Sequence, residues 1–279
     1  MAKLYFRHGV VSSAKTLNLL ACAHSYKVQG KKVLVIKPKL DTRFGAERVK
    51  SRAGLECQAD LLVEAGTVFA KGTFSGADCV LVDEAQFVTP EVIEQLRDVA
   101  TKEGVPVICY GLRTDFRSRL FPASKRLMEL ADVIEDVKTT CTFCNRRAIL
   151  NLKSVDGVPT LAGPTVCLGC EELYVPACYQ HFVEKVEVAS GKQIDFAAAA
   201  VEGARADAEQ AKKSKQPGDA SSDGKANNVA ADVKEEPRGV MGATAKALAD
   251  DAVSRKATDC VAEPHCEPTP EKRRRTAEV

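Results

Sequence analysis

A phosphate-binding pattern occupies the residues from Gly9 to Thr16, which read G-V-V-S-S-A-K-T. The spacing matches the loop G-x-x-x-x-G-K-[ST], in which backbone N–H groups surround phosphate oxygens at the N-terminus of a helix. Lys15 would reach the outer phosphates, and Thr16 would bind magnesium. Ala14 departs from the pattern because it stands where the second glycine belongs, and its Cβ would point into a crowded turn. The competing interpretation is an ordinary helix start with an exposed lysine.

Two adjacent carboxylates, Asp83 and Glu84, follow the apolar run Val80-Leu81-Val82. Such a run is typical of a strand buried on both faces, and ligands of parallel sheets bind at the carboxyl ends of strands. Asp83 would there hold magnesium opposite Thr16, and Glu84 would accept a proton from an attacking hydroxyl group. Asp-Glu pairs also occur in solvated turns. Because the phosphate loop and this strand end occur together in the expected order, we favour a nucleotide-binding site.

Metal-ligand spacing recurs in the second half of the chain, in three pairs of residues separated by two others: Cys141 and Cys144, Cys167 and Cys170, and Cys178 and His181. Two such pairs present four ligands for tetrahedral zinc. A quartet of protein ligands leaves no open coordination position, which predicts a structural rather than a catalytic zinc ion. Spacing alone allows the first pair to combine with either of the other two.

The elements that must position these residues alternate between strand and helix. Apolar runs predict strands at 3–6, 32–36, 79–82 and 105–110, and helical signals predict helices at 16–28, 89–102 and 122–130. The helix at 89–102 begins with Thr89-Pro90-Glu91, a capping threonine, a proline and an acidic first turn. This alternation predicts an α/β fold of the P-loop type, a parallel sheet with helices on both faces.

The overall composition excludes several classes of protein. The 279 residues carry 40 Lys+Arg against 38 Asp+Glu, so no global basic field is available to bind nucleic acid. No apolar run approaches the roughly 18 residues that a membrane helix needs. Eleven cysteines without a secretion signal indicate reduced thiols. We therefore expect a soluble intracellular protein that binds neither membrane nor nucleic acid.

A change of composition divides the chain near residue 191. The 89 residues from 191 to 279 include 20 alanines and a single aromatic residue, Phe196. So little apolar surface predicts a mostly disordered tail, with short helices at 196–213 and 243–253. The expected organisation is a nucleotide-binding kinase domain at 1–138, a zinc-binding subdomain at 139–190 and the low-complexity tail at 191–279.

Together these motifs resemble the zinc-containing P-loop thymidine kinases of the cellular and bacterial type, the type II family. The stretch L-D-T-R-F-G at 40–45 supports the resemblance, as does D-E-A-Q-F at 83–87, which is similar to the signature D-E-x-Q-F. G-L-R-T-D-F at 111–116 is similar to the family's G-L-x-T-D-F segment, and the cysteine pairs follow it. The match covers most of residues 1–185, and the tail has no counterpart in the shared core.

The resemblance implies transfer of the γ-phosphate of ATP to the 5′-hydroxyl of thymidine, with magnesium accompanying ATP. Glu84 is then the general base, while Thr16 and Asp83 lie on the magnesium side. Arg43 and Asp41 belong to a loop near the phosphates. The implied ATP-binding set is Gly9, Val10, Val11, Ser12, Ser13, Ala14, Lys15, Thr16 and Arg43.

The resemblance also implies how thymine is recognised. Four residues form an apolar wall, namely Phe87, Leu112, Phe116 and Phe121. The loop between the outer cysteine pairs is a lasso that hydrogen-bonds the base through main-chain groups, and its implied substrate residues are Cys167, Leu168, Gly169, Cys170 and Tyr174. The structural zinc quartet is then Cys141, Cys144, Cys178 and His181. The family further implies a homotetramer and feedback by thymidine triphosphate.

Three departures from the family pattern lie in the expected binding site. Val11 replaces a methionine, Ala14 replaces a glycine, and Cys170 follows Gly169 where Gly-Gly is usual. The alternatives to an active kinase are a catalytically weakened relative with a regulatory role and a zinc-dependent nucleic-acid-binding protein. The basic run at 272–275 supports the second alternative, and it also resembles a nuclear-import signal.

Overall fold

The computed structural model describes residues 1–166 and 174–213. The first compact unit, Met1–Ala220, contains every described residue. Residues 191–213 of the tail predicted at 191–279 are described, whereas the rest of it, including the helix predicted at 243–253, lies outside the described residues. None of the helices in the described ranges is both long and apolar enough to cross a membrane.

A six-stranded parallel sheet in the order β5-β2-β6-β7-β1-β8 forms the centre of this unit. Its strands are β1 (Leu4–His8), β2 (Val33–Pro38), β5 (Leu61–Val63), β6 (Cys79–Val82), β7 (Val107–Gly111) and β8 (Val133–Asp136). The predicted strands are confirmed, whereas β5 and β8 escaped prediction because they are short edge strands with partly exposed side chains. The parallel sheet of the P-loop type is the fold that the alternation of elements predicted.

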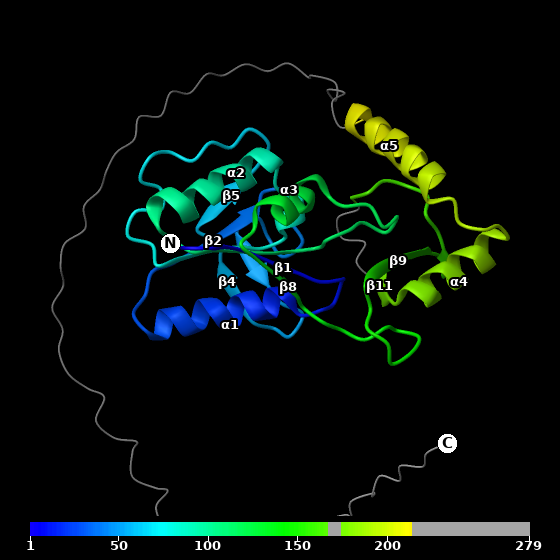
Figure 1. Ribbon diagram of the computed structural model, residues 1–279, viewed down its shortest axis with the longest axis horizontal. Helices are drawn as coiled ribbons and strands as arrows, with labels where there is room; N and C mark the ends of the chain where they lie inside the picture. The colour runs from blue at the N-terminus through cyan, green and yellow to red at the C-terminus, as the bar shows by residue number, and fades with distance from the viewer. Residues whose placement is uncertain (167–173, 214–279) are drawn as a thin grey trace, which may run out of the picture. The chain divides into compact units, whose positions relative to one another are not determined.

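Helices cover both faces of the sheet, as Figure 1 shows. Helix α1 (Lys15–Val28) packs on one face, while α2 (Pro90–Asp98) and α3 (Pro122–Leu130) pack on the other. Successive side chains of a strand point to opposite faces, so Leu81 joins the core on the α1 side and Val82 joins the core on the α2 and α3 side. Burial on both faces explains why the central strands read as continuous apolar runs.

Short elements complete this part of the molecule. The strands β3 (Arg48–Lys50) and β4 (Glu56–Gln58) form an antiparallel hairpin beside the α1 face. A 3₁₀ turn, η1 (Ala85–Phe87), follows β6, and a π-helical turn, η2 (Val99–Glu103), extends α2 to the end of the predicted helix at 89–102. No apolar periodicity marks β3 and β4, since each has only three residues.

A smaller subdomain follows the parallel sheet. An antiparallel sheet in the order β10-β9-β11 is built from β9 (Leu150–Val155), β10 (Val158–Pro159) and β11 (Tyr174–Ala177). Helix α4 (Tyr179–Ser190) packs on it through Phe182 and Val186, which share a core with Leu152. The last described element is α5 (Phe196–Lys213), at the position of one of the predicted short helices.

Candidate active site

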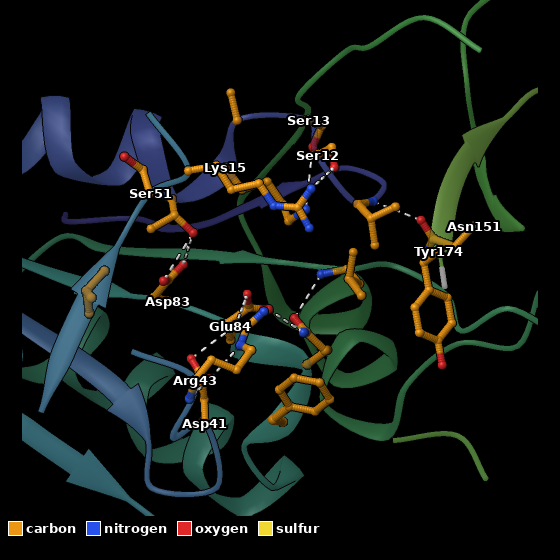
Figure 2. Close-up of a pocket in the computed structure, with 18 of the residues that line it drawn as sticks. Ser12, Ser13, Lys15, Asp41, Arg43, Ser51, Asp83, Glu84, Asn151 and Tyr174 are labelled. Atoms are coloured by element: carbon orange, nitrogen blue, oxygen red, sulfur yellow. Dashed lines mark hydrogen bonds and ion pairs between the residues drawn. The ribbon is translucent and has the colours of Figure 1, made fainter. Parts of the chain in front are cut away.

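Loops from four parallel strands meet at the carboxyl end of the sheet and enclose a cavity of about 320 Å³. The loop after β1 contributes the phosphate-binding pattern, and the residues after β6 contribute Asp83 and Glu84. Figure 2 shows these side chains facing the cavity together with Arg43 from the loop after β2. Asn151 of β9 and Tyr174 of β11, both in the small subdomain, also line the cavity. The cavity therefore joins the parallel sheet to the small subdomain.

The loop between β1 and α1 has the tight backbone that a phosphate-binding loop requires. A Cβ at Gly9 would lie 2.7 Å from the carbonyl oxygen of Val137 and would also collide with Ser13, so only glycine fits there. Lys15 folds back and donates from Nζ to the carbonyl oxygen of Val10 at 2.7 Å. Asn151 accepts a hydrogen bond from the backbone N–H of Val11 at 2.8 Å. The loop is thus held by contacts from within (Lys15) and from the small subdomain (Asn151).

Ala14 lies in the left-handed region with φ of +63° and ψ of +24°, immediately before α1. This conformation costs an L-residue roughly 1–2 kcal/mol relative to glycine. Ser12 in the same loop also has a positive φ, +58°. Alanine therefore stands at a position whose backbone angle favours glycine, and it adopts that angle at a cost.

Asp83 and Thr16 face each other at the mouth of the phosphate loop. Thr16 Oγ1 lies 3.2 Å from both carboxylate oxygens of Asp83 and donates to that carboxylate. Burial, together with the neighbouring charge of Glu84, raises the pKa of Asp83 to about 7. A hydroxyl and a carboxylate in this arrangement are the oxygen ligands that magnesium prefers, so these two residues fit a magnesium ion that accompanies a nucleotide.

Glu84 is fixed by hydrogen bonds to both of its carboxylate oxygens. Arg43 Nη2 donates to Oε1 at 2.6 Å, and Gln86 Nε2 donates to Oε2 at 2.6 Å. Burial opposes ionisation of Glu84, but the cations of Arg43 and Lys15 outweigh it and lower the pKa of this carboxyl below its ordinary value. Glu84 also has a left-handed backbone, with φ of +47°. The side chain is therefore ionised and held in one orientation.

Arg43 is itself oriented by Asp41, whose carboxylate accepts from Nε at 2.6 Å and from Nη2 at 3.1 Å. Asp41 is buried and lies 3.6 Å from the buried ammonium of Lys37. Lys37 Nζ donates to the backbone carbonyls of Gly45 and Arg48, which fixes the loop after β2. These successive ion pairs hold the guanidinium of Arg43 against the carboxylate of Glu84.

Aromatic side chains line the cavity as well. Phe87 and Phe121 make an edge-to-face contact with ring centroids 6.0 Å apart, and Phe116 lies 6.0 Å from the ring of Tyr174. Leu112 lines the cavity beside them, and its backbone N–H donates to the side chain of Gln86 at 2.9 Å. All five of these predicted substrate residues line the same cavity.

The outer pairs of the predicted zinc quartet converge in the small subdomain. Ligand atoms of Cys141, Cys144, Cys178 and His181 all lie within 4.8 Å of one another. The sulfur atoms of Cys144 and Cys178 are 3.9 Å apart, close to the roughly 3.8 Å edge of a tetrahedron with Zn–S bonds of about 2.3 Å. His181 Nδ1 lies 3.6 Å from Cys141 Sγ and 3.5 Å from Cys178 Sγ. The cluster fits a tetrahedral zinc ion.

Other predicted site residues are placed differently. Gly9 and Val10 shape the phosphate loop but are absent from the residues that line the main cavity. The predicted lasso residues Cys167, Leu168, Gly169 and Cys170 lie outside the described residues. Their immediate neighbours, Thr165 and Val166, do line the cavity.

Several cavity residues were not among the predicted ones. Gln86 lies within the D-E-A-Q-F motif, which was the only signal for it. Arg52 donates to Ser12 Oγ at 3.0 Å from the hairpin of β3 and β4. Asn151 and Thr165 reach the cavity from the small subdomain, and no local pattern in the sequence marks either residue.

Comparisons of the sequence with known proteins agree with this geometry. The family model described as "Thymidine kinase" matches residues 2–182. The chain belongs to the thymidine kinase family. A thymidine kinase of Lactiplantibacillus plantarum is 41% identical over 184 residues, which are 65% of this chain and 96% of the relative. Those of Lactococcus lactis and Enterococcus faecalis are 40% and 39% identical over 65% of this chain and 97% and 95% of their own lengths.

One solved structure, a Pif1 helicase from Candida albicans, overlaps with a TM-score of 0.31 and 13% identity. The overlap covers 49% of this chain and 36% of the helicase. A similarity this weak carries no inference, and the family assignment rests on the sequence comparisons.

Replacing Ala14 by glycine should stabilise this thymidine kinase family member. Glycine relieves the left-handed strain at φ +63° but adds about 0.4–1 kcal/mol of unfolded-state entropy, so we expect a net gain of about 0.5–1 kcal/mol in the free energy of unfolding. Urea denaturation of both proteins measures it. The matched control is Ala21→Gly, at an exposed helical position of α1, which should instead cost about 1 kcal/mol. A loss of stability in both variants would contradict the strain at position 14.

Replacing Asp83 by asparagine should change how stability depends on pH. Because the fold raises the pKa of Asp83 from 3.8 to about 7, ionisation destabilises the folded state, and stability falls as pH rises through this range. Asparagine cannot ionise, so Asp83→Asn should have a higher Tm than wild type at pH 8, and the difference should vanish near pH 4. Tm values from pH 4 to 8 without added magnesium test this. The control, Asp98→Asn at an exposed position, should show no such trend, and an equal shift at pH 5 and pH 8 for Asp83→Asn would refute the interpretation.

Proposed function

We propose that this chain is an ATP-dependent thymidine kinase in which Glu84 is the general base for transfer of the γ-phosphate of ATP to the 5′-hydroxyl of thymidine. The proposal rests on family membership and on one observation, namely that Glu84 lines a single cavity together with a phosphate loop and a set of aromatic side chains. A nucleoside whose base occupies the aromatic end would present its 5′ side toward the phosphate loop.

The residues at the phosphate end have complementary roles in this proposal. Backbone N–H groups of the loop from Gly9 to Thr16 bind the phosphates, and the cations of Lys15 and Arg43 offset their charge. Thr16 and Asp83 would hold magnesium, which neutralises phosphate charge when it is bound with ATP. The carbonyl of Val10, which accepts from Lys15 in the structure, would release the ammonium to the incoming phosphates.

Proton transfer falls to Glu84. As the 5′ oxygen forms its bond to the γ-phosphorus, the bond to the leaving ADP oxygen breaks and the 5′-hydroxyl proton passes to the Glu84 carboxylate. The lowered pKa of Glu84 keeps it ionised at neutral pH, so it can accept this proton. Arg43 and Gln86 limit its rotation, which favours the productive orientation.

The aromatic end would select the base. Phe87, Leu112, Phe116, Phe121 and Tyr174 provide an apolar slot for a planar ring. The lasso would supply main-chain hydrogen bonds to thymine, and a base with a different pattern of donors and acceptors would leave polar groups unpaired. This built cavity favours an active kinase over a zinc-dependent nucleic-acid-binding protein, which has no use for paired carboxylates at a strand end.

The cysteine and histidine cluster would hold a structural zinc ion through Cys141, Cys144, Cys178 and His181. Backbone N–H groups of Phe143 and Arg146 point at the sulfur atoms of Cys141 and Cys144, at 3.4 and 3.5 Å, and would stabilise thiolates. Zinc there would join the strand β11 and helix α4 to the segment before β9, and it would thereby fix both ends of the lasso.

Further proposals rest on the family resemblance alone: a homotetramer, feedback by thymidine triphosphate in the substrate site, and a cytoplasmic location. The basic run at 272–275, the candidate signal for nuclear entry, lies outside the described residues.

Replacing Glu84 by glutamine should reduce kcat for thymidine phosphorylation by about 10²- to 10⁴-fold, the usual contribution of a general base. Formation of thymidine monophosphate from thymidine, ATP and magnesium measures the effect. The matched control, Glu94→Gln on the exposed face of α2, should keep wild-type turnover. Wild-type turnover by Glu84→Gln would remove Glu84 from the mechanism. Absence of turnover in folded, zinc-loaded wild type would indicate the catalytically weakened alternative.

Replacing Cys144 by serine should lower the zinc content below one ion per chain and lower the Tm, because one ligand of a closed tetrahedral site is lost. Metal analysis and thermal unfolding measure both effects. Cys57→Ser is the matched control, since that half-buried thiol lies outside the cluster and its loss should leave zinc content unchanged. Full zinc occupancy in Cys144→Ser would contradict the assigned quartet.

A further inference from the structure

Helix α5 lies beyond the residues that the family model matches, which end at 182. One face of it nevertheless packs against the part of the small subdomain that leads into the cavity. Ala199, Gly203 and Asp207 are spaced four residues apart and therefore share that face. Ala199 and Gly203 are buried, although the helix as a whole is rich in alanine and poor in large apolar residues. Small side chains here allow a close approach of the helix backbone.

Asp207 binds Thr165, which lines the cavity next to Val166. Its Oδ1 accepts the backbone N–H of Thr165 at 2.7 Å, and its Oδ2 accepts the Thr165 hydroxyl at 2.6 Å. Hydrogen bonds to an ionised acceptor are shorter and stronger than those between neutral groups. A single side chain of α5 therefore fixes both the backbone and the side chain of a cavity-lining residue.

Gly203 covers the buried guanidinium of Arg117. A Cβ at Gly203 would lie within 2.6 Å of the guanidinium nitrogens, so any larger residue would displace one of the two. Arg117 donates to the carbonyl oxygen of Leu161 at 3.0 Å, to that of Gly163, and to Thr165 Oγ1 at 2.9 Å. Helix α5 thus fixes the position of the Arg117 guanidinium, which in turn binds the backbone of residues 161–163 just before Thr165.

A second buried cation connects the same segment to the aromatic wall. Lys153 Nζ donates to the carbonyl oxygen of Ala162 at 3.1 Å and lies 4.4 Å from the ring centroid of Phe116. The Arg117 guanidinium lies 4.3 Å from the same centroid. Two cations on one ring couple the position of Phe116 to the backbone of residues 161–163.

The N-terminus of α5 is anchored independently. Asp195 Oδ1 accepts the backbone N–H groups of Ala197 and Ala198, both at 2.9 Å, which caps the helix. Phe196 stacks on Phe182 of α4, and its carbonyl accepts from Arg119 at 3.0 Å. The helix is therefore fixed at one end by packing and presents Asp207 about three turns later.

We propose that α5 positions the nucleoside end of the cavity, with Asp207 as the positioning residue that fixes Thr165. The assignment of this end to thymidine rests on the proposed function. Loss of Asp207 frees residues 161–166 and weakens thymidine binding, while the phosphate loop and Glu84, at the other end, keep their geometry. Loss of Asp207 should therefore raise KM for thymidine and leave kcat and KM for ATP nearly unchanged.

The test is steady-state kinetics of the full chain carrying Asp207→Ala. We expect KM for thymidine to rise about tenfold, the size of one charge-assisted hydrogen bond, with kcat and KM for ATP changed less than about twofold. Asp207→Asn should recover most of the loss, because its Oδ1 still accepts the Thr165 N–H. Glu202→Ala, an exposed acidic position on the same helix, is the matched control and should behave as wild type.

Amide hydrogen exchange gives a second readout that does not depend on activity. The Thr165 amide should lose protection in Asp207→Ala and keep it in Glu202→Ala. Gly203→Ala is a second route to the same state, because its methyl group displaces Arg117, and it should raise KM for thymidine in the same direction.

Two results would overturn the proposal. One is unchanged protection of Thr165 in Asp207→Ala, and the other is lost protection with an unchanged KM for thymidine. A wild-type chain that phosphorylates no thymidine would instead contradict the proposed function, and the exchange comparison would still decide whether α5 holds the segment.

Discussion

The active site depends on keeping two neighbouring carboxylates, the buried Asp83 and the partly buried Glu84, in different environments. Like charges on adjacent buried side chains repel, so their pKa values are driven apart. Arg43 and Lys15 lower the pKa of Glu84, whereas burial and the charge of Glu84 raise that of Asp83 to about 7. Glu84 is thereby an ionised base, and a bound cation would stabilise the ionised form of Asp83. The ion pairs of Asp41 with Arg43 and with Lys37 help to maintain this difference in pKa, because they keep the Arg43 cation beside Glu84.

The parallel sheet makes that arrangement possible because the carboxyl ends of its strands lie at one edge, so the four loops that follow β1, β2, β6 and β7 all begin there. The cost is backbone strain, since Ser12, Ala14 and Glu84 all have positive φ at the ends of β1 and β6. Such conformations persist only where the surroundings determine them. Here the continuous apolar core on both faces of the sheet fixes the strand ends, and the loops cannot relax without moving them. The stability of the core thus supports the strain in the site.

Features of the site that are determined by neighbouring residues in the sequence could be predicted, and features that depend on tertiary contacts could not. The phosphate loop and the Asp-Glu pair could be placed from sequence because spacing and a buried strand determine them locally. The zinc quartet was ambiguous by spacing, and the fold brings the outer pairs together. Asn151 and Thr165 could not be predicted as cavity residues, because they reach the site through tertiary contacts with Val11 and Asp207 that have no local signature. Edge strands such as β5 were missed since they lack two-sided burial.

Helix α5 shows that the average composition of a segment does not determine whether the segment packs against the rest of the protein. A segment with few large apolar side chains gains little from burial, which is why a disordered tail was the natural expectation for 191–279. The helix at 196–213 is held on the protein by interactions other than the burial of large apolar side chains. Alanine and glycine at 199 and 203 permit close packing, and a capped N-terminus and the Asp207–Thr165 hydrogen bonds supply directional contacts. Few contacts of this kind suffice when their partners are already ordered, as the buried Arg117 is. The contribution of α5 is therefore specific to the cavity wall it touches, and its loss should alter binding more than global stability.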